Sequence, residues 1–167
     1  QWNRDAWQSD PWGRNFLGAP PQGRAHYAFF QHILKSMSPA PIGGGVRGGG
    51  GRSAILFPHG VLFRKEEAEM RQKLVEADLV ECVLGLGPNL FYNSPMEACI
   101  VICRSDKPAE QKGKVLFIDA LNEVTRERSV SYLKPEHQAH IAETYHGFVS
   151  EAGFAHLADL DEIAAQD

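Results

Sequence analysis

The sequence predicts an α/β domain, and three observations lead to this class. Short apolar segments of strand character alternate with segments whose apolar residues recur at helical spacing. The length of 167 residues fits one domain. The composition, with 43% hydrophobic and 23% charged residues, is ordinary for a globular protein. We therefore expect residues 1–167 to form a single domain.

The amino-terminal third is predicted to contain a loop, a helix and a glycine-rich connection. Residues 1–24 carry the turn signals "DPWG" and "GAPPQG", which indicate loop. Residues 25–37, "AHYAFFQHILKSM", have apolar residues at helical spacing, and a Ser-Pro pair follows them. Residues 40–52 contain seven glycines, so they cannot pack a core and are predicted to be a flexible connection.

Residues 53–120 are predicted to form the core sheet with one helix. The expected strands are residues 53–57, 79–86, 98–103 and 114–120. In the second strand, Val80, Cys82, Leu84 and Leu86 alternate, so we expect them on one face. The third strand, "ACIVIC", is apolar throughout, which is typical of a strand covered on both faces.

Helices are expected between and after these strands. Residues 66–77 have helical spacing, and Glu67 with Arg71 is expected to form an ion pair on the exposed side, as is Glu69 with Lys73. Residues 121–167 are predicted to be C-terminal helices. Within them Pro135 fits a first helical turn, Ile141, Tyr145 and Phe148 form the apolar stripe that follows, and a last helix covers "DLDEIAA".

Charge and cysteine content exclude several classes of protein. The formal net charge of −4 argues against a surface that is basic overall, although a local basic patch remains open. The longest apolar runs are far shorter than the ~20 residues of a membrane span, and no signal-peptide pattern opens the chain. Cys82, Cys99 and Cys103 give no disulfide framework, which favours a reducing, cytoplasmic location.

Two strand ends are candidate binding sites. The stretch "GRSAILFPHGVLF" begins as a buried strand that stops at Pro58, His59 and Gly60. In open α/β sheets, ligands bind beyond the carboxyl ends of strands. In "GLGPNLFYNSPMEACIVIC", Phe91 and Tyr92 stand beside Asn93 in a polar turn between two core strands. These aromatics either form a stacking platform for a planar ring or simply cover the end of the sheet.

Other reactive side chains lack the spacing that chemistry requires. His137 and His140 lie three residues apart without a third ligand, so we expect no metal site. Nothing matches the GxSxG pattern of a serine nucleophile, and Asp119 is explained equally well as a turn cap. The residues alone therefore indicate an α/β domain and leave open whether the aromatic turn is a planar-ligand site or a cover for the sheet end.

A resemblance adds to this reading. The stretch "HYAFFQHIL" and the later segments "GRSAILFPHGVLF", "LVECVLGLGPNLFYNSP" and "ACIVIC" resemble successive segments of the methyltransferase (modification) subunits of type I restriction-modification systems. In that family a "DYAFLQHIL" helix precedes a "GRAAVVLPNGVLFRG" strand and turn, an "NLFYxT" segment and an apolar "ACILVL" strand. The order and spacing match over most of residues 10–165.

The resemblance implies transfer of a methyl group from S-adenosylmethionine to the exocyclic N6 amino group of adenine in DNA, with the base flipped out of the duplex. It implies a partial Rossmann-like methyltransferase fold, a three-layer sandwich. It places Phe91 against the flipped base with Tyr92 as neighbour, Pro58, His59 and Asn93 along the cleft, and Phe29 beside the cofactor. It also implies DNA and the specificity and restriction subunits as partners, and no membrane.

Two family motifs are missing. No FxGxG-like cofactor loop precedes residue 25, and Asn-Pro-Pro-Phe/Tyr occurs nowhere. We therefore expect this chain to resemble the C-terminal half of the catalytic domain, with the main cofactor motif upstream and no catalytic residue in residues 1–167. Alone, it should not methylate DNA. Two alternatives are a related RNA amino-methyltransferase and a non-catalytic remnant that serves as an interaction module.

Overall fold

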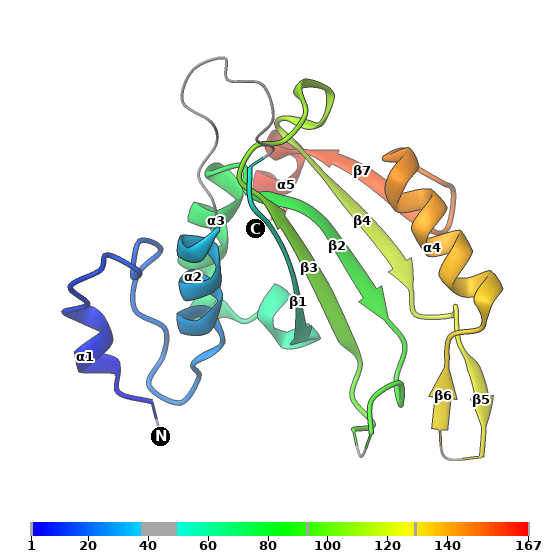
Figure 1. The fold of residues 1–167 in the computed structure, drawn as a ribbon, viewed down its shortest axis with the longest axis horizontal. Coiled ribbons are helices and arrows are strands. Elements are labelled where there is room, and N and C mark those ends of the chain that lie inside the picture. Colours follow the sequence, from blue (N-terminus) through cyan, green and yellow to red (C-terminus); the bar gives the residue numbers. More distant parts are fainter. Residues whose placement is uncertain (1, 38–49, 93, 129, 167) are drawn as a thin grey trace.

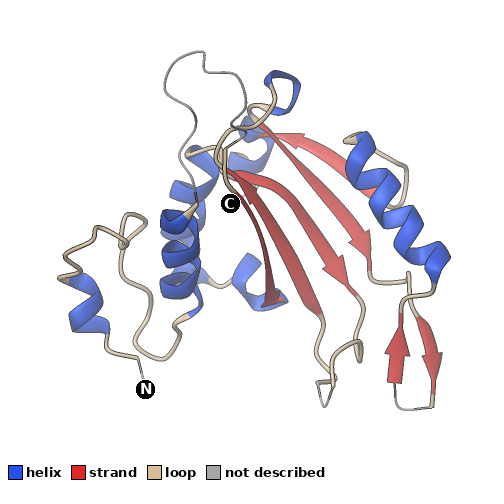
Figure 2. Ribbon diagram, viewed as in Figure 1, coloured by secondary structure: helices blue, strands red, loops and turns tan. Residues whose placement is uncertain are grey.

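The computed structural model describes residues 2–37, 50–92, 94–128 and 130–166 (Figure 1). Most of the predicted glycine-rich connection at 40–52 therefore lies outside the described residues, as does Asn93. In the described ranges, no helix combines the length and the apolar character needed to cross a membrane. The α/β class is confirmed: a mixed sheet carries helices on both faces (Figure 2).

The main sheet has five strands in the order β1-β3-β2-β4-β7. They are β1 (Arg52–Pro58), β2 (Val80–Leu86), β3 (Ala98–Arg104), β4 (Lys114–Ala120) and β7 (Ala155–Asp159). β3 is antiparallel to both β1 and β2, β4 is parallel to β2, and β7 is antiparallel to β4. β1, β2 and β4 thus run in one direction, and their carboxyl ends lie at the same edge. The four predicted strands are confirmed.

Three helices cover the first face, which we call the α2 face. They are α2 (His26–Ser36), α3 (Ala68–Glu76) and α5 (Leu160–Ala164). Tyr27, Phe30 and Leu34 of α2 pack with Phe57 and Val101 of the sheet in one apolar cluster. The helical spacing therefore predicted this contact, because residues three and four apart share a helix face.

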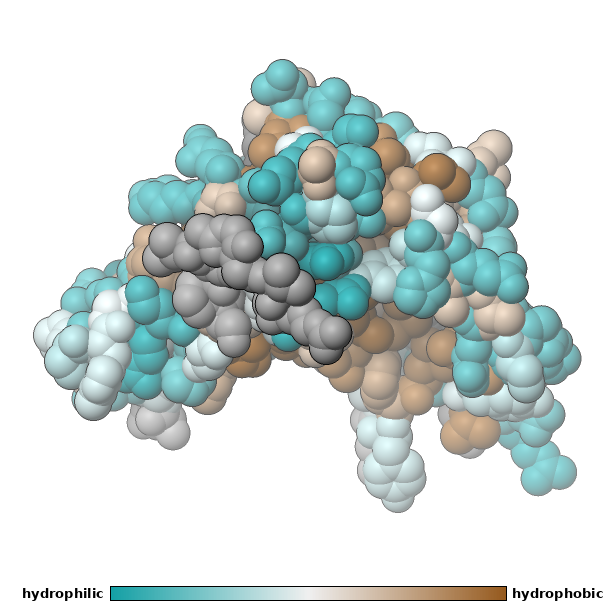
Figure 3. Space-filling view, turned by 45° about the horizontal axis from the view of Figure 1, so that its top comes forward, coloured by the Kyte–Doolittle hydropathy of each residue, from teal (hydrophilic) through white to brown (hydrophobic). Residues whose placement is uncertain are grey.

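The second face, the α4 face, is covered by α4 (Pro135–Gly147). Ile141, Tyr145 and Phe148 pack against the sheet as the stripe predicted. The chain leaves α4 at Phe148 with φ 49, a left-handed conformation that commonly ends helices. Coverage is incomplete, because Leu56 of β1 remains half exposed, and Figure 3 shows apolar surface near the centre of its view.

The prediction that Val80, Cys82, Leu84 and Leu86 share one face of the sheet was wrong. A β-bulge lies between Val80 and Cys82, so Val80 packs on the α2 face while Cys82, Leu84 and Leu86 pack on the α4 face. A bulge adds one residue to a strand and reverses the alternation on one side of it.

The predicted exposed ion pair of Glu67 was also wrong. Glu67 ends a short 3-10 turn (Lys65–Glu67) before α3 and is completely buried. Its carboxylate lies 3.7 Å from Nη1 of Arg64, while Arg71 donates to the Arg64 carbonyl at 2.7 Å. The other predicted pair, Glu69 with Lys73, forms at 2.6 Å.

Residues 121–167 are not only helical, and residues 1–24 are not only loop. The C-terminal part contains β7 and a hairpin of β5 (Thr125–Glu127) and β6 (Val130–Tyr132). The amino-terminal part contains the five-residue helix α1 (Arg4–Gln8), which Asn3 caps through its side chain. Two further 3-10 turns cover His59–Leu62 and Ala109–Gln111.

Candidate functional site

The common carboxyl edge of β1, β2 and β4 borders an open crevice of about 760 Å³. Its wall includes His59 just beyond β1, Gly85 near the end of β2 and Asp119 near the end of β4. The loop at residues 150–154 and the start of β7 close one side, where the Asp119 N–H donates to the Phe154 carbonyl at 2.8 Å. Of the residues predicted along the cleft, His59 lines this crevice, Pro58 is not among its lining residues, and Asn93 lies outside the described residues.

His59 is the titratable residue held most specifically at this edge. Its Nδ1 lies 3.4 Å from the Glu97 carboxylate, which directly precedes β3. Its Nε2 is buried and has no hydrogen-bond partner among the described residues. The ring rests over Gly85, where an added Cβ would lie 3.6 Å from Nε2. One ring nitrogen is therefore left without a partner beside the crevice, and because it is buried, a polar group can reach it only after the ring or its neighbours move.

Phe91 and Tyr92 leave β2 in the connection to β3 and take different positions. Phe91 is partly buried against the apolar cluster of the α4 face, and its carbonyl accepts the Ser94 N–H at 3.0 Å. Tyr92 is 94% exposed. Neither ring is among the described residues that line the strand-end crevice. Phe91 is thus partly buried at the sheet end, whereas Tyr92 is almost fully exposed.

The β5–β6 hairpin, which the sequence did not predict, lies against this connection. Leu121 and Val124 approach Gly87 so closely that a Cβ there would be 2.6 Å from the Leu121 carbonyl oxygen and 2.8 Å from Val124 Cγ1. Farther along, the Ser131 N–H donates to the Asn89 carbonyl at 3.1 Å. A glycine directly after a predicted strand was the one sequence signal for such a close approach.

Phe29 lies elsewhere. It is 65% exposed on α2 and lines a cavity of about 390 Å³ together with Trp7 of the amino-terminal segment and His32 of α2. It is not one of the described residues at the strand-end crevice. The structure therefore does not bring Phe29 together with Pro58, His59 or Tyr92.

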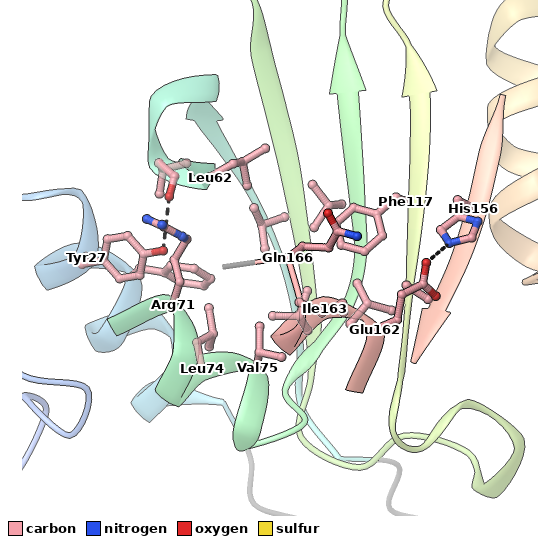
Figure 4. Close-up of a pocket in the computed structure, with 17 residues that line it drawn as sticks. Tyr27, Leu62, Arg71, Leu74, Val75, Phe117, His156, Glu162, Ile163 and Gln166 are labelled. Carbon is pink, nitrogen blue, oxygen red and sulfur yellow. Dashed lines mark hydrogen bonds and ion pairs between the residues drawn. The ribbon is translucent and has the colours of Figure 1, made fainter. Parts of the chain in front are cut away.

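A second cavity, also about 390 Å³, lies between the α2 face and helices α3 and α5 (Figure 4). Its walls are mostly aliphatic. Tyr27 donates its hydroxyl to the Val61 carbonyl at 3.3 Å, and burial raises the pKa of that hydroxyl. On the opposite side, His156 and Glu162 pair at 2.7 Å. His156 and Glu162 are about half exposed, so this largely apolar cavity opens to solvent on their side.

The remaining candidates serve structural contacts. His137 Nδ1 accepts the Lys134 N–H at 3.3 Å, which gives one backbone N–H at the start of α4 a partner. His140 lies between Glu123 at 3.3 Å and Glu151 at 3.0 Å. The three cysteines are free and buried. In the ranges that the structure describes, no group of three His, Cys, Asp or Glu side chains is placed to hold a metal ion.

Comparison with known proteins gives one consistent family. The sequence model for "N-6 DNA Methylase" matches residues 1–167. The type I restriction enzyme HindI methylase subunit of Haemophilus influenzae is 32% identical over 183 residues, which cover 100% of this chain and 37% of that protein. The MjaVIII methylase subunit of Methanocaldococcus jannaschii is 37% identical over 120 residues, covering 70% of this chain and 21% of that protein.

Solved structures agree. The methyltransferase subunit of a type I restriction-modification system from Streptococcus thermophilus superimposes with a TM-score of 0.84 and 28% identity, covering 100% of this chain and 33% of that one. A modification subunit of a putative type I restriction enzyme from Vibrio vulnificus has a TM-score of 0.61 at 16% identity, which supports the fold alone. The chain spans between about a fifth and two fifths of these relatives.

Proposed function

The chain belongs to the N-6 DNA methylase family, and we propose that it forms part of the methyltransferase subunit of a type I restriction-modification system. The reaction is transfer of a methyl group from S-adenosylmethionine to N6 of adenine in DNA. DNA and the specificity and restriction subunits are the proposed partners. The sheet is proposed to be the C-terminal half of a Rossmann-like methyltransferase fold, because β3 lies antiparallel between two strands that run in parallel.

The observation that carries this proposal is the turn between β2 and β3. It leaves the sheet at the edge where β1, β2 and β4 all end, and it presents the uncovered ring of Tyr92. N6 of adenine is engaged in base pairing inside a duplex, so the base must be extruded before it can react. An exposed aromatic ring then replaces the stacking that the base loses.

The residues of the site have separate proposed roles. Phe91 anchors the turn on the α4 face, and Tyr92 stacks on the extruded base. Pro58 ends β1, and His59, the next residue, lines the crevice. Its unpartnered Nε2 is proposed to meet a polar edge of the substrate once the ring turns toward the crevice. Asn93 retains its expected place at the cleft as a sequence-based proposal.

The described residues do not fit a complete site for S-adenosylmethionine. Phe29, the residue expected beside the cofactor, lines a cavity next to α1 and not the strand-end crevice. We therefore assign no step of methyl transfer to these residues and propose that other parts of the enzyme hold most of the cofactor. This chain contributes base stacking, orientation and exclusion of water from the strand-end crevice.

The test is methyl transfer to DNA by a complete methylase subunit that carries this sequence, assembled with its specificity subunit. Base–aromatic stacking contributes about 1–3 kcal/mol, so Tyr92→Ala should lower kcat/KM by about 5- to 150-fold. Tyr92→Phe keeps the ring and should retain most activity. Phe91→Leu keeps an apolar contact with the α4 face while removing the ring.

The outcomes are distinct. A large loss for Tyr92→Ala, with activity retained in Tyr92→Phe, supports stacking at this turn. A larger loss for Phe91→Leu than for Tyr92→Ala would move the stacking role to Phe91. If both ring-removing variants methylate DNA at the wild-type rate, the proposed base contact is wrong. The 167-residue chain alone serves as the negative control and is expected to transfer no methyl group.

A further inference from the structure

A second surface lies beside the proposed base-contacting turn. The β5–β6 hairpin and the β2–β3 connection both extend beyond the sheet at the same end of the molecule (Figure 1). The hairpin strands, Thr125–Glu127 and Val130–Tyr132, make no ladder with the main sheet. The core therefore does not need this hairpin for its own strand pairing, which raises the question of what it contacts.

The hairpin is held firmly against the turn. Its base packs on Gly87 through Leu121 and Val124, at distances that leave no space for a Cβ. Its second strand donates the Ser131 N–H to the Asn89 carbonyl, and Ser131 is only 8% exposed. Both contacts lie within five residues of Tyr92 in sequence. The hairpin consequently has a fixed position relative to the proposed base contact.

Two unpaired cationic side chains extend from this fixed hairpin. Arg126 and Arg128 are exposed, and neither has a hydrogen-bond or ion-pair partner in the part of the chain that the structure describes. Glu127, which lies between them, accepts the Tyr132 hydroxyl at 2.8 Å. In a chain of net charge −4, this leaves a local positive charge on the hairpin, which contacts the turn that carries Tyr92 through Asn89.

The backbone at Arg128 also departs from the ordinary. Its φ is 55, a left-handed conformation in which glycine, asparagine or aspartate would be less strained. A long cationic side chain at such a position contributes nothing to the turn itself. This is consistent with a role for the guanidinium outside the fold.

We propose that the β5–β6 hairpin holds the DNA backbone next to the extruded adenine, with Arg126 and Arg128 binding phosphates. This inference rests on the proposed function. Guanidinium groups match phosphate oxygens in geometry and charge. Contacts to phosphates set the position of a protein on DNA without reading sequence, so the hairpin positions the duplex while Tyr92 contacts the base. Arg126 and Arg128 are thus positioning residues.

The test measures binding of the 167-residue chain to a duplex that carries one unpaired adenine, by fluorescence anisotropy from about 50 to 200 mM salt. Each phosphate contact contributes about 0.9 to the slope of log affinity against log salt. Arg126→Gln/Arg128→Gln should therefore reduce that slope by about 1.8. Equivalently, the loss of affinity over this fourfold salt range should become about 12-fold smaller.

Two further variants control for charge. Lys112→Gln/Lys114→Gln removes the same charge next to the amino end of β4, far along that strand from the hairpin, and should leave the slope nearly unchanged. Arg126→Lys/Arg128→Lys keeps the charge and should keep most of the slope. An equal loss in the lysine-to-glutamine control would show that only net charge matters, and would overturn the inference. Equal unfolding midpoints in urea would show that folding is intact.

Failure of this inference can be told from failure of the proposed function. If the arginine variant binds DNA with the wild-type slope while Tyr92→Ala loses methyl transfer in the complete subunit, the hairpin does not bind phosphates and the proposed function stands. If the wild-type chain shows no salt-dependent binding to DNA, the hairpin inference is wrong. If the complete subunit also transfers no methyl group, both are wrong.

Discussion

The close contact at Gly87 predicts how much stability depends on the docking of the β5–β6 hairpin. A Cβ at Gly87 would lie 2.6 Å from the Leu121 carbonyl oxygen and 2.8 Å from Val124 Cγ1. The first of these atoms belongs to the backbone, so it cannot rotate away as a flexible side chain would. Gly87→Ala must therefore displace the connection that leads into the hairpin.

Gly85→Ala is a matched control two residues earlier. A Cβ at Gly85 would meet its nearest atoms, His59 Nε2 and the Ile118 carbonyl oxygen, at 3.6 Å, which is ordinary van der Waals contact. Replacing glycine by alanine lowers the entropy of the unfolded chain and stabilises a compatible site by about 0.4–1 kcal/mol. Both variants gain this entropic stabilisation, so the difference between their free energies of unfolding reports the steric clash at position 87.

Overpacking of this kind costs about 1–3 kcal/mol. We expect the free energy of unfolding of Gly87→Ala to lie below that of Gly85→Ala by this amount. Urea unfolding followed by circular dichroism measures it, and an m-value of about 2 kcal/mol/M gives midpoints that differ by about 0.5–1.5 M. Equal midpoints would refute the reasoning, because they would mean that the hairpin connection moves without cost. Its fixed position beside Tyr92 would then be lost as well.

Two other predictions concern titration and reactivity. The hydrogen bond to Glu151, together with a second carboxylate, raises the pKa of His140. The resulting stability is fully present below the unfolded pKa of about 6.5 and is lost as pH rises through the higher folded pKa. In His140→Gln, the free energy of unfolding should no longer fall as pH rises through that range, as measured by urea unfolding at several pH values. If the variant shows the same pH dependence as the wild type, His140 is not the cause. Burial raises the pKa of Cys82 and Cys103 to about 12 and that of Cys99 to about 11, so a thiol reagent at pH 8 should modify none of the three before urea is added.

Local pattern was sufficient for the elements that bury an apolar face. The helix at His26–Ser36 follows from a spacing of 3.6 residues, and the four predicted strands follow from alternation in 79–86 and from short apolar runs in the other three. The bulge at Val80 could not be predicted in this way, because the sequence 79–86 alternates without a visible interruption. Its cause lies in a distant contact: the bulged strand places Glu81 within 3.4 Å of Arg52 and 3.5 Å of Arg104. These arginines come from the ends of two other strands.

The sequence did not predict the β5–β6 hairpin for a different reason. The strands of the hairpin have three residues each, are mostly polar, and have no Asn-Gly or Gly-Gly turn between them. What fixes them is the contact with Gly87 and Asn89, about forty residues earlier in the chain. The same limit applies to the site. The sequence located the aromatic turn, but only packing decides that Phe91 is partly buried while Tyr92 is exposed.

The register of β3 explains why the parts of the site meet at all. Pro58 of β1 and Leu86 of β2 both pair with Ala98, so these three residues lie in a line across the sheet. Consequently the next residue of each strand, His59 and Gly87, lies at one edge together with Glu97, which precedes Ala98. A shift of β3 by one residue would exchange Ile100 and Ile102 on the α4 face for the smaller Cys99, Val101 and Cys103 on the α2 face, so close packing on both faces opposes it. The packing of the core thereby fixes the distance from His59 to the turn that carries Tyr92, and no contact between the two is needed.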